Sequence, residues 1–242
     1  MRVLILAAGL GSRLRPLTDL TPKPLLPLGT TNILERLLFQ LNSSFRDVEI
    51  YINCSYLAES ITEYISRQSL ENRPKIIWER EPLGTAVTTM HLFNSEPSQG
   101  LLVIHGDLVL GNDSMQEISK IVKEQAESFL MVHERPFNQA RSIVSIQDAR
   151  VTGIAEVPIS QEESSLNTSP VLVNSGILFF TPNSLTTFEI PEQGTEISPY
   201  LIQKLSEAGK LFTQLWRWER VAVDSISSYE KAIALAAADP FA

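Results

Sequence analysis

The sequence predicts an α/β fold of three layers, with a doubly wound, mostly parallel sheet and a small mixed α/β lobe. Apolar segments alternate with amphipathic segments over the first 140 residues, a pattern typical of strands and helices that build a parallel sheet. From Ser142 onward the pattern changes to short β segments. The length of 242 residues and the hydrophobic content of 43% are enough for one substantial core. We therefore expect a single domain over residues 1–242, with 1–140 and 141–242 as its two parts.

Each element of the first part follows from its own pattern. Residues 3–8 form an unbroken apolar run, which is typical of a strand buried on both faces. Apolar residues from Ile33 to Leu41 recur at helical spacing behind the capping candidates Thr31 and Asn32, so a helix is expected there. The same reasoning predicts further strands at 48–53, 75–78, 101–105 and 129–133. It predicts further helices at 57–68, 85–93 and 115–125.

The second part has less regular patterns. Short β segments are expected at 143–146, 151–154 and 171–180, and the polar tract 160–169 is interpreted as a mobile surface loop. A helix is expected at 197–208, strand character at 212–224 and a final helix at 226–238.

Composition excludes several classes of function. A net charge of −8 argues against a nucleic-acid binder, because such binding needs a basic surface. No apolar run is long enough to span a bilayer, and the residues ahead of Gly9 are too few for a signal sequence, so a cytoplasmic protein without membrane contact is expected. The single cysteine, Cys54, permits no intrachain disulfide. Residues 1–24 carry four basic side chains against Asp19 alone, which favours a small anionic ligand.

A loop with two glycines follows the first expected strand. Gly9 and Gly11 lack a Cβ atom, so the main chain there can adopt left-handed dihedrals and bring its N–H groups close to a triphosphate. Arg13 adds a planar, permanently charged group suited to phosphate oxygens. A dinucleotide-binding fingerprint would need a third glycine where this chain has Leu14, and the Gly-Lys-Ser/Thr of a P-loop is absent. The alternative is a turn with surface cations.

Lys23 is placed by its neighbours. Pro22 fixes the preceding backbone dihedral, and Pro24 disfavours the helical conformation at Lys23. The ammonium group is therefore carried on a stiff segment, as stabilisation of a developing phosphate charge requires.

Two aspartates follow expected strands. Asp107 ends the apolar segment 101–105 with Gly106, and Asp224 ends the segment 212–224. Mg²⁺ binds one or two protein carboxylates together with waters and substrate phosphates. The pair is therefore predicted to hold one Mg²⁺ ion. The alternative is that Asp224 caps the final helix and Asp107 lies in a turn.

The pattern resembles the sugar-1-phosphate nucleotidyltransferases, including the small enzymes that act on mannose, heptose or N-acetylmuramate 1-phosphate. The resemblance covers Leu6–Leu17 and Pro22-Lys23-Pro24, and continues at Glu81-Pro82-Leu83-Gly84-Thr85-Ala86 and Gly106-Asp107 and, less closely, at Asn174-Ser175-Gly176 and Asp224. It implies a Rossmann-like nucleotidyltransferase fold. It also implies a reaction in which a nucleoside triphosphate and a sugar 1-phosphate form a nucleotide sugar and pyrophosphate, with Mg²⁺ as the cofactor.

The resemblance implies a role for each matching residue. Arg13 and Lys23 are the expected catalytic residues, and Asp107 and Asp224 the expected metal ligands. Expected nucleotide contacts are Leu6, Ala7, Ala8, Gly9, Gly11, Ser12, Glu79, Gly84 and Thr85, with Glu79 in the part that contacts the base. Expected acceptor contacts are Asp107, Arg141, Glu156, Asn174, Gly176 and Glu196. Arg141 is our own addition, chosen because it precedes the segment 143–146. For Glu79 the alternative is an exposed acid beside a turn.

Two departures from the family pattern concern the acceptor. Val157 stands where many members have a lysine that holds the sugar phosphate, and Asp224-Ser225-Ile226-Ser227 replaces an Asp-x-Gly-Thr. The second form resembles the phosphocholine cytidylyltransferases of the same superfamily. A cytidylyltransferase for phosphocholine or a similar phosphoester, and a non-catalytic nucleotide-sensing subunit, therefore stay as alternatives. The identity of the nucleotide and the oligomeric state do not follow from the sequence.

Overall fold

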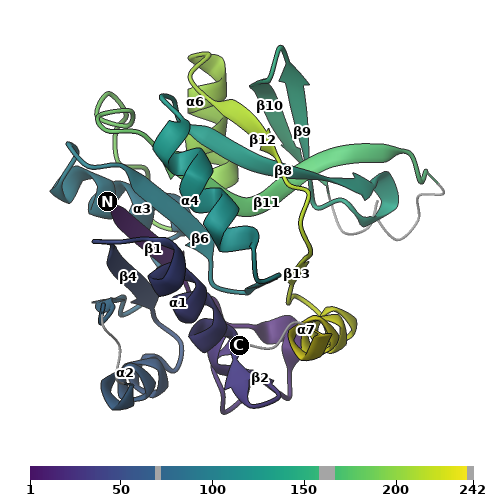
Figure 1. The fold of residues 1–242 in the computed structure, drawn as a ribbon. Helices are drawn as coiled ribbons and strands as arrows, with labels where there is room; N and C mark the ends of the chain where they lie inside the picture. The colour runs from purple at the N-terminus through teal and green to yellow at the C-terminus, as the bar shows by residue number, and fades with distance from the viewer. Residues whose placement is uncertain (69–71, 158–166, 239–242) are drawn as a thin grey trace. The chain divides into compact units, whose positions relative to one another are not determined.

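The computed structural model describes residues 1–68, 72–157 and 167–238, which fall into two compact units (Figure 1). The first unit contains Met1–Pro82, Val103–Gln125 and Trp218–Ala242, and the second contains Leu83–Leu102 and Ala126–Arg217. Both units combine segments that are distant in sequence. Residues 1–140 are expected to bind the nucleotide and residues 141–242 the acceptor. This division by ligand does not coincide with the boundaries of the compact units, and it stays a prediction. Most of the expected loop 160–169 lies outside the described residues.

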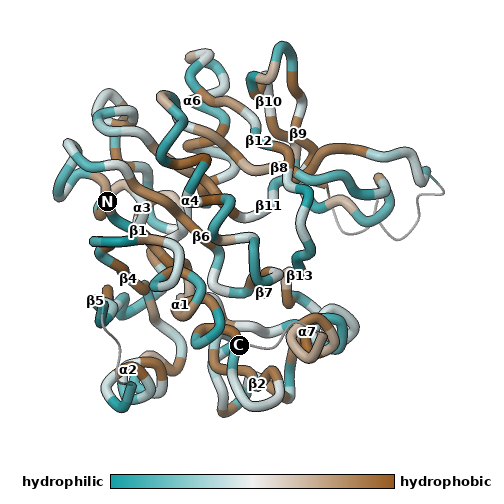
Figure 2. The backbone as a smooth tube through the Cα atoms, in the orientation of Figure 1, coloured by the Kyte–Doolittle hydropathy of each residue, from teal (hydrophilic) through white to brown (hydrophobic). Residues whose placement is uncertain are grey.

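The first unit is built on parallel strands. Its strands are β1 (Arg2–Leu6), β4 (Glu49–Cys54), β5 (Lys75–Trp78) and most of β6 (Leu101–His105), in the order β5-β4-β1-β6, with parallel β1–β4 and β4–β5 pairs. The first two residues of β6, Leu101 and Leu102, are grouped with the second unit. Leu101 to Ile104 are fully buried, and Figure 2 shows hydrophobic residues along β6. The α/β fold with a parallel sheet is confirmed. The first strand ends at Leu6, two residues earlier than expected, and the Ala7 N–H donates to the side chain of Asn53 instead of to a main-chain carbonyl of β4.

Helices accompany these strands at the expected places. They are α1 (Ile33–Ser44), α2 (Ala58–Arg67), α4 (Ser114–Glu124) and α7 (Ile226–Ala238). Asn32 caps α1, since its Oδ1 atom accepts from the Glu35 N–H at 2.8 Å. This confirms one of the two predicted capping candidates. α7 packs against a cluster that includes Leu14, Ile33 and Val109, so the last helix and the loop after β1 share one core.

Short elements complete the first unit, and all of them except β13 were not indicated by the sequence. They are the turns η1 (Ser12–Leu14) and η2 (Lys23–Leu25), the hairpin of β2 (Pro27–Leu28) and β3 (Thr31–Asn32), and the antiparallel pair of β7 (Leu108–Leu110) and β13 (Arg220–Ala222). β13 is the second piece of the expected strand 212–224. β12 ends at Leu215, although the Trp216 N–H still donates to the Val132 carbonyl, and strand pairing resumes at Arg220.

The second unit has a mixed sheet, as expected for the smaller lobe. Its strands are β8 (Phe129–Pro136), β9 (Ser142–Gln147), β10 (Arg150–Glu156), β11 (Pro170–Phe180) and β12 (Phe212–Leu215), in the order β11-β8-β12-β10-β9. Only the β12–β8 pair is parallel among these. The helical elements are α3 (Thr85–Ser95), η3 (Phe137–Gln139), η4 (Ser198–Ile202) and α6 (Gln203–Glu207). Across the described residues of both units, no helix has the length and apolar character needed to cross a membrane.

Candidate functional site

The loop after β1 is held in shape by its own residues. Gly11 has a φ of 63°, and its carbonyl accepts from the Thr18 hydroxyl at 2.8 Å. A Cβ atom at Gly11 would lie 3.0 Å from Thr18 Cγ2. Gly11 therefore uses the freedom that the sequence suggested, whereas Gly9 does not adopt a positive φ. A Cβ atom at Gly9 would meet nothing within 4 Å, so the main chain there is open to a ligand.

Strand pairing brings Asp107 and Asp224 to the same edge of the first unit. β7 begins directly after Asp107, and β13 ends two residues before Asp224. The Val223 N–H continues this ladder by donating to the Asp107 carbonyl at 2.9 Å. Two carboxylates that are 117 positions apart in the sequence thus follow the same short ribbon.

Each of these carboxylates faces a predicted catalytic cation. Lys23 Nζ lies 2.5 Å from Asp107 Oδ2, and both side chains are mostly buried, with 15% and 25% exposed. The Arg13 guanidinium lies 3.7 Å from Asp224 Oδ2. The four predicted residues of the chemical step therefore come together in the first unit.

The environment of Asp107 favours its ionised form. Burial is the largest single effect and raises the pKa of this carboxyl group, but the charge and hydrogen bond of Lys23 outweigh burial when the positive charges of His105 and Arg220 are added. The net result is a pKa below the ordinary value for aspartate. Asp107 is thus a carboxylate ready to bind a cation, and it is neutralised by Lys23 in the absence of one.

Asp224 does not cap the last helix. The Ser225 hydroxyl accepts from the Ser228 N–H at 3.2 Å, which is the contact of an N-cap, and the Ser228 hydroxyl lies 3.1 Å from Asp224 Oδ1. Asp107 lies in the turn between β6 and β7 and precedes no helix. The capping alternative for Asp224 is therefore wrong, because its neighbour Ser225 occupies that position.

Glu79 is buried rather than exposed. It directly follows β5, its exposed fraction is 2%, and its N–H donates to the Cys54 carbonyl at 2.9 Å. Glu79 Oε1 accepts from Asn53 Nδ2 at 2.9 Å, and Asn53 Oδ1 accepts from the Ala7 N–H at 2.7 Å. One buried amide thus connects two predicted nucleotide contacts, Ala7 and Glu79. The alternative of an exposed acid beside a turn does not hold for Glu79.

In the second unit, Gly84 and Thr85 are tied to the segment around Glu196. Gly84 has a φ of 94°, and a Cβ atom there would lie 2.6 Å from the Thr195 carbonyl oxygen. The Thr85 hydroxyl lies 2.5 Å from Glu196 Oε2 and accepts from the Ile197 N–H at 2.8 Å. Glycine is required at position 84 by this close approach, and Thr85 fixes the carboxylate of Glu196.

Three other predicted acceptor residues, Glu156, Asn174 and Gly176, lie near this segment in the same unit, whereas Asp107 belongs to the first unit. Burial raises the pKa of Glu156, and the nearby negative charge of Glu196 raises it further. Asn174 Oδ1 accepts from the Gly176 N–H at 2.7 Å, and Asn174 Nδ2 lies 3.4 Å from the Ser198 hydroxyl. Glu156, Glu196 and Asn174 therefore form a polar group on the second unit.

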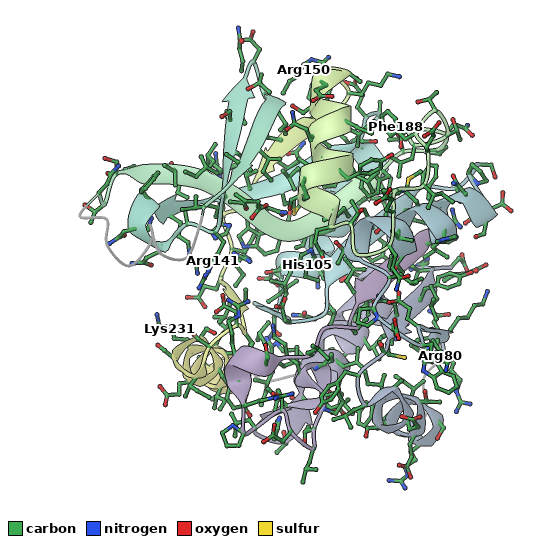
Figure 3. The ribbon with its side chains drawn as sticks, turned by 180° about the vertical axis from the view of Figure 1, so that it is seen from behind. Arg80, His105, Arg141, Arg150, Phe188 and Lys231 are labelled. Carbon is green, nitrogen blue, oxygen red and sulfur yellow. The ribbon has the colours of Figure 1, made fainter. Side chains whose placement is uncertain are left out.

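Arg141 lies across from Val157, the position where the family pattern has lysine. Ser142 and Glu156 are partners in the β9–β10 ladder, and the Val157 N–H donates to the Arg141 carbonyl at 2.8 Å. Residues directly opposite each other in an antiparallel pair project from the same face. Arg141 is exposed and lies where the chain enters β9 (Figure 3). The guanidinium and the missing lysine thus share one face of the ribbon.

A family model described as nucleotidyl transferase matches residues 2–236. The chain belongs to this family. A bifunctional protein GlmU from Methanococcus maripaludis is 32% identical over 220 residues, which cover 87% of this chain and 48% of that protein. The chain spans about half the length of the GlmU proteins it matches.

Other nucleotidyl transferases match over their whole length. The N-acetylmuramate alpha-1-phosphate uridylyltransferase of Neisseria meningitidis is 26% identical, with 98% of this chain and 99% of that protein covered. The crystal structure of HddC from Yersinia pseudotuberculosis has a TM-score of 0.76 at 21% identity, with 96% and 98% of the two chains covered. HddC has also been solved in complex with GMP-PN. These structural matches agree with the nucleotidyltransferase fold that the sequence predicted.

Sequence reasoning missed the residues that support this nucleotidyl transferase site. Asn53 was included in an apolar strand, and Thr18 and Ser228 were given no role. The one signal for Asn53 in the sequence was a polar residue between the apolar Ile52 and Cys54, both of which are fully buried in the structure. Among the described residues, no group of three or more His, Cys, Asp or Glu side chains is arranged to hold a metal ion.

Proposed function

We propose that this nucleotidyl transferase joins a nucleoside triphosphate to a sugar 1-phosphate and releases pyrophosphate. The observation that carries the proposal is the meeting of Lys23, Asp107, Arg13 and Asp224 at one edge of the first unit. The names of the relatives support a sugar phosphate as the acceptor, since they include a heptose 1-phosphate guanylyltransferase and a UTP–glucose-1-phosphate uridylyltransferase. They do not favour phosphocholine.

The proposed reaction needs positioning and charge stabilisation more than proton transfer. A phosphate oxygen of the acceptor attacks the α-phosphorus in line and needs no general base, because a phosphate monoester is already anionic at neutral pH. Main-chain N–H groups from Ala8 to Ser12 bind the triphosphate. Lys23 and Arg13 stabilise the charge that develops in the transition state.

The donor set fits Mg²⁺. Two carboxylates are within the usual number that this ion takes from a protein, with waters and phosphates completing its shell. Asp107 and Asp224 would hold the ion, which when bound neutralises phosphate oxygens. In its absence Lys23 and Arg13 pair with these carboxylates. A cation held by Asp107 and Asp224 would compete with Lys23 and Arg13 for the same carboxylate oxygens.

Arg141 supplies the cation for the acceptor phosphate in this proposal, since Val157 replaces the lysine of the family pattern. Arg141→Gln should raise the acceptor KM about tenfold or more, because a charge-assisted hydrogen bond is lost, and should leave the nucleotide KM unchanged. Val157→Lys in the Arg141→Gln background should restore much of the acceptor KM, because both positions lie on one face of the β9–β10 ribbon. An unchanged acceptor KM in Arg141→Gln rejects this assignment.

Pyrophosphate release tests the proposed reaction. GTP, UTP, dTTP, CTP and ATP would each be combined with a set of sugar 1-phosphates and with phosphocholine, with Mg²⁺ or with EDTA. At least one triphosphate with a sugar 1-phosphate should release pyrophosphate only with Mg²⁺. Release with phosphocholine alone would support the cytidylyltransferase alternative. No release from a folded protein that binds nucleotide would support the sensing subunit. A cytoplasmic location stays a prediction.

A further inference from the structure

The buried side-chain amide of Asn53 contacts the residues that directly follow two strands of the first unit, β1 and β5. Asn53 is 3% exposed and lies between the fully buried Ile52 and Cys54 of β4. In the sheet register, Asn53 is the partner of Leu6 in β1 and of Ile77 in β5. The loop after β1 and the segment after β5 therefore both begin within reach of its side chain.

The two partners of Asn53 determine how its amide is oriented. The Ala7 N–H can only donate, so the Asn53 oxygen faces it at 2.7 Å. The Asn53 nitrogen then donates to Glu79 Oε1 at 2.9 Å, and a carboxylate can only accept. The reversed amide would place two donors together at Ala7 and two acceptors together at Glu79. A single orientation therefore satisfies both buried partners.

From this arrangement we infer that Asn53 is a positioning residue for nucleotide binding, which holds the Ala7 N–H and the Glu79 carboxylate in one fixed geometry. The inference rests on the proposed function and on the nucleotide contacts that the sequence analysis predicts for Ala7 and Glu79. Asn53 is buried and acts through these two residues. Its loss therefore weakens nucleotide binding and leaves the KM for the acceptor unchanged.

The donor and acceptor pattern allows a reversal experiment. Asn53→Asp keeps the size of the side chain and the acceptor for Ala7, but it places a second acceptor against Glu79. Glu79→Gln in that background supplies a donor, so the introduced carboxylate can accept from both sides. Asn53→Leu removes both contacts. Gln40→Ala is the matched control, because Gln40 is a 4% exposed amide of the same unit that bonds to the Leu110 and Gly111 carbonyls.

Amide hydrogen exchange at Ala7 in the ligand-free protein gives the first test. Asn53→Leu should lose the protection of this amide, whereas Asn53→Asp and Gln40→Ala should keep it. Equal protection at Ala7 in Asn53→Leu and in the parent protein would overturn the inference. This measurement involves no catalysis, so its result stands even where the proposed reaction is wrong.

Calorimetric titration with GTP, UTP, dTTP, CTP and ATP, each with Mg²⁺, gives the second test. For the nucleotide that the parent binds most tightly, Asn53→Asp should raise the Kd about ten- to a hundredfold. The double variant should bind within about threefold of Glu79→Gln alone. A double variant no better than Asn53→Asp overturns the inference. A parent that binds nucleotide and shows this rescue, but releases no pyrophosphate, contradicts the proposed function and leaves the inference standing.

Discussion

At the scale of single residues, the position of Lys23 depends both on its neighbours in the sequence and on a contact with a distant residue. Pro22 has extended backbone dihedrals, and Lys23 begins the short turn η2 with Pro24 as its next residue. The stiff segment was expected from its two prolines, but the expected extended conformation of Lys23 is wrong, because the Leu25 N–H donates to the Pro22 carbonyl and closes a helical turn that includes Lys23. The partner of Lys23 does not follow from the local sequence, because Asp107 lies 84 positions further along the chain. Local proline chemistry therefore predicted that Lys23 is held, and strand pairing decides what it faces.

Lys23→Met should lower kcat by about a hundredfold or more, with a smaller effect on the nucleotide KM, because the lost charge acts mainly in the transition state. Steady-state kinetics with the active substrate pair would measure both constants. Lys75→Met is the matched control, since Lys75 forms an exposed pair with Glu49 in the same unit and should leave kcat unchanged. A variant in which only KM rises would make Lys23 a ground-state contact.

The same substitution has a pH signature. The pKa of Asp107 is lowered in the folded protein, so its ionisation stabilises the fold above the ordinary aspartate pKa, and this stabilisation is lost as the pH falls through the lower folded value. Lys23→Met removes the main cause of the lowering. The variant should therefore be less stable than the parent in urea at pH 7, with a smaller difference near pH 3. A pH-independent difference would contradict this account of Asp107.

Glu196→Gln should stabilise the protein at pH 7, whereas Lys23→Met should destabilise it. The pKa of Glu156 is raised above its ordinary value of 4.5, first by burial and then by Glu196, so the stability falls as the pH rises from 4.5 through the folded value. Removing the charge of Glu196 should reduce this loss, while the new amide oxygen can still accept from Thr85. Urea unfolding should show a gain over the parent at pH 7 and little gain at pH 4. Equal effects at both pH values would exclude the interaction between the two glutamates.

At the scale of elements, the pair of β7 and β13 completes the carboxylate site. Helices and strands with clear periodicity were predicted within a few residues, and α7, β5 and β6 at their observed bounds. β7 and β13 have three residues each, too few for a periodic pattern, and they pair across more than a hundred positions. The sequence therefore identified Asp107 and Asp224 individually, but not the ribbon that brings them together.

At the start of α7, Ser225 caps the helix and its neighbour Asp224 is the predicted metal ligand. Ser225→Ala should destabilise the protein by about 1 kcal/mol, because the N-cap contact is lost from a helix that packs on the core of the first unit. Asp224→Asn should change stability little, since its side chain does not cap the helix, yet it should lower activity steeply and recover partly at high Mg²⁺. Thermal unfolding and activity would be measured on both variants. Near-normal activity of Asp224→Asn at low Mg²⁺ would leave Asp107 as the only protein ligand.

At the scale of the whole molecule, the predicted residues divide between the two compact units. Arg13, Lys23, Asp107, Asp224 and Glu79 belong to the first, whereas Thr85, Glu156, Asn174 and Glu196 belong to the second. The predicted residues of the chemical step lie on the first unit and most predicted acceptor contacts lie on the second, but the predicted nucleotide contacts Gly84 and Thr85 also belong to the second unit. The order of the residues in the sequence did not predict which unit each belongs to, because both units are assembled from segments that are distant in the chain.

The proposed reaction transfers a nucleotidyl group from a nucleoside triphosphate to a sugar 1-phosphate. Its most direct test uses a nucleoside triphosphate labelled at the α-phosphorus, incubated with a sugar 1-phosphate and Mg²⁺. The label should appear in a nucleotide sugar, with one pyrophosphate released for each product molecule. EDTA should abolish the transfer, and Lys23→Met should slow it about a hundredfold or more. Retention of all label in the triphosphate, with every triphosphate and sugar phosphate tried and with nucleotide binding intact, would contradict the proposed reaction.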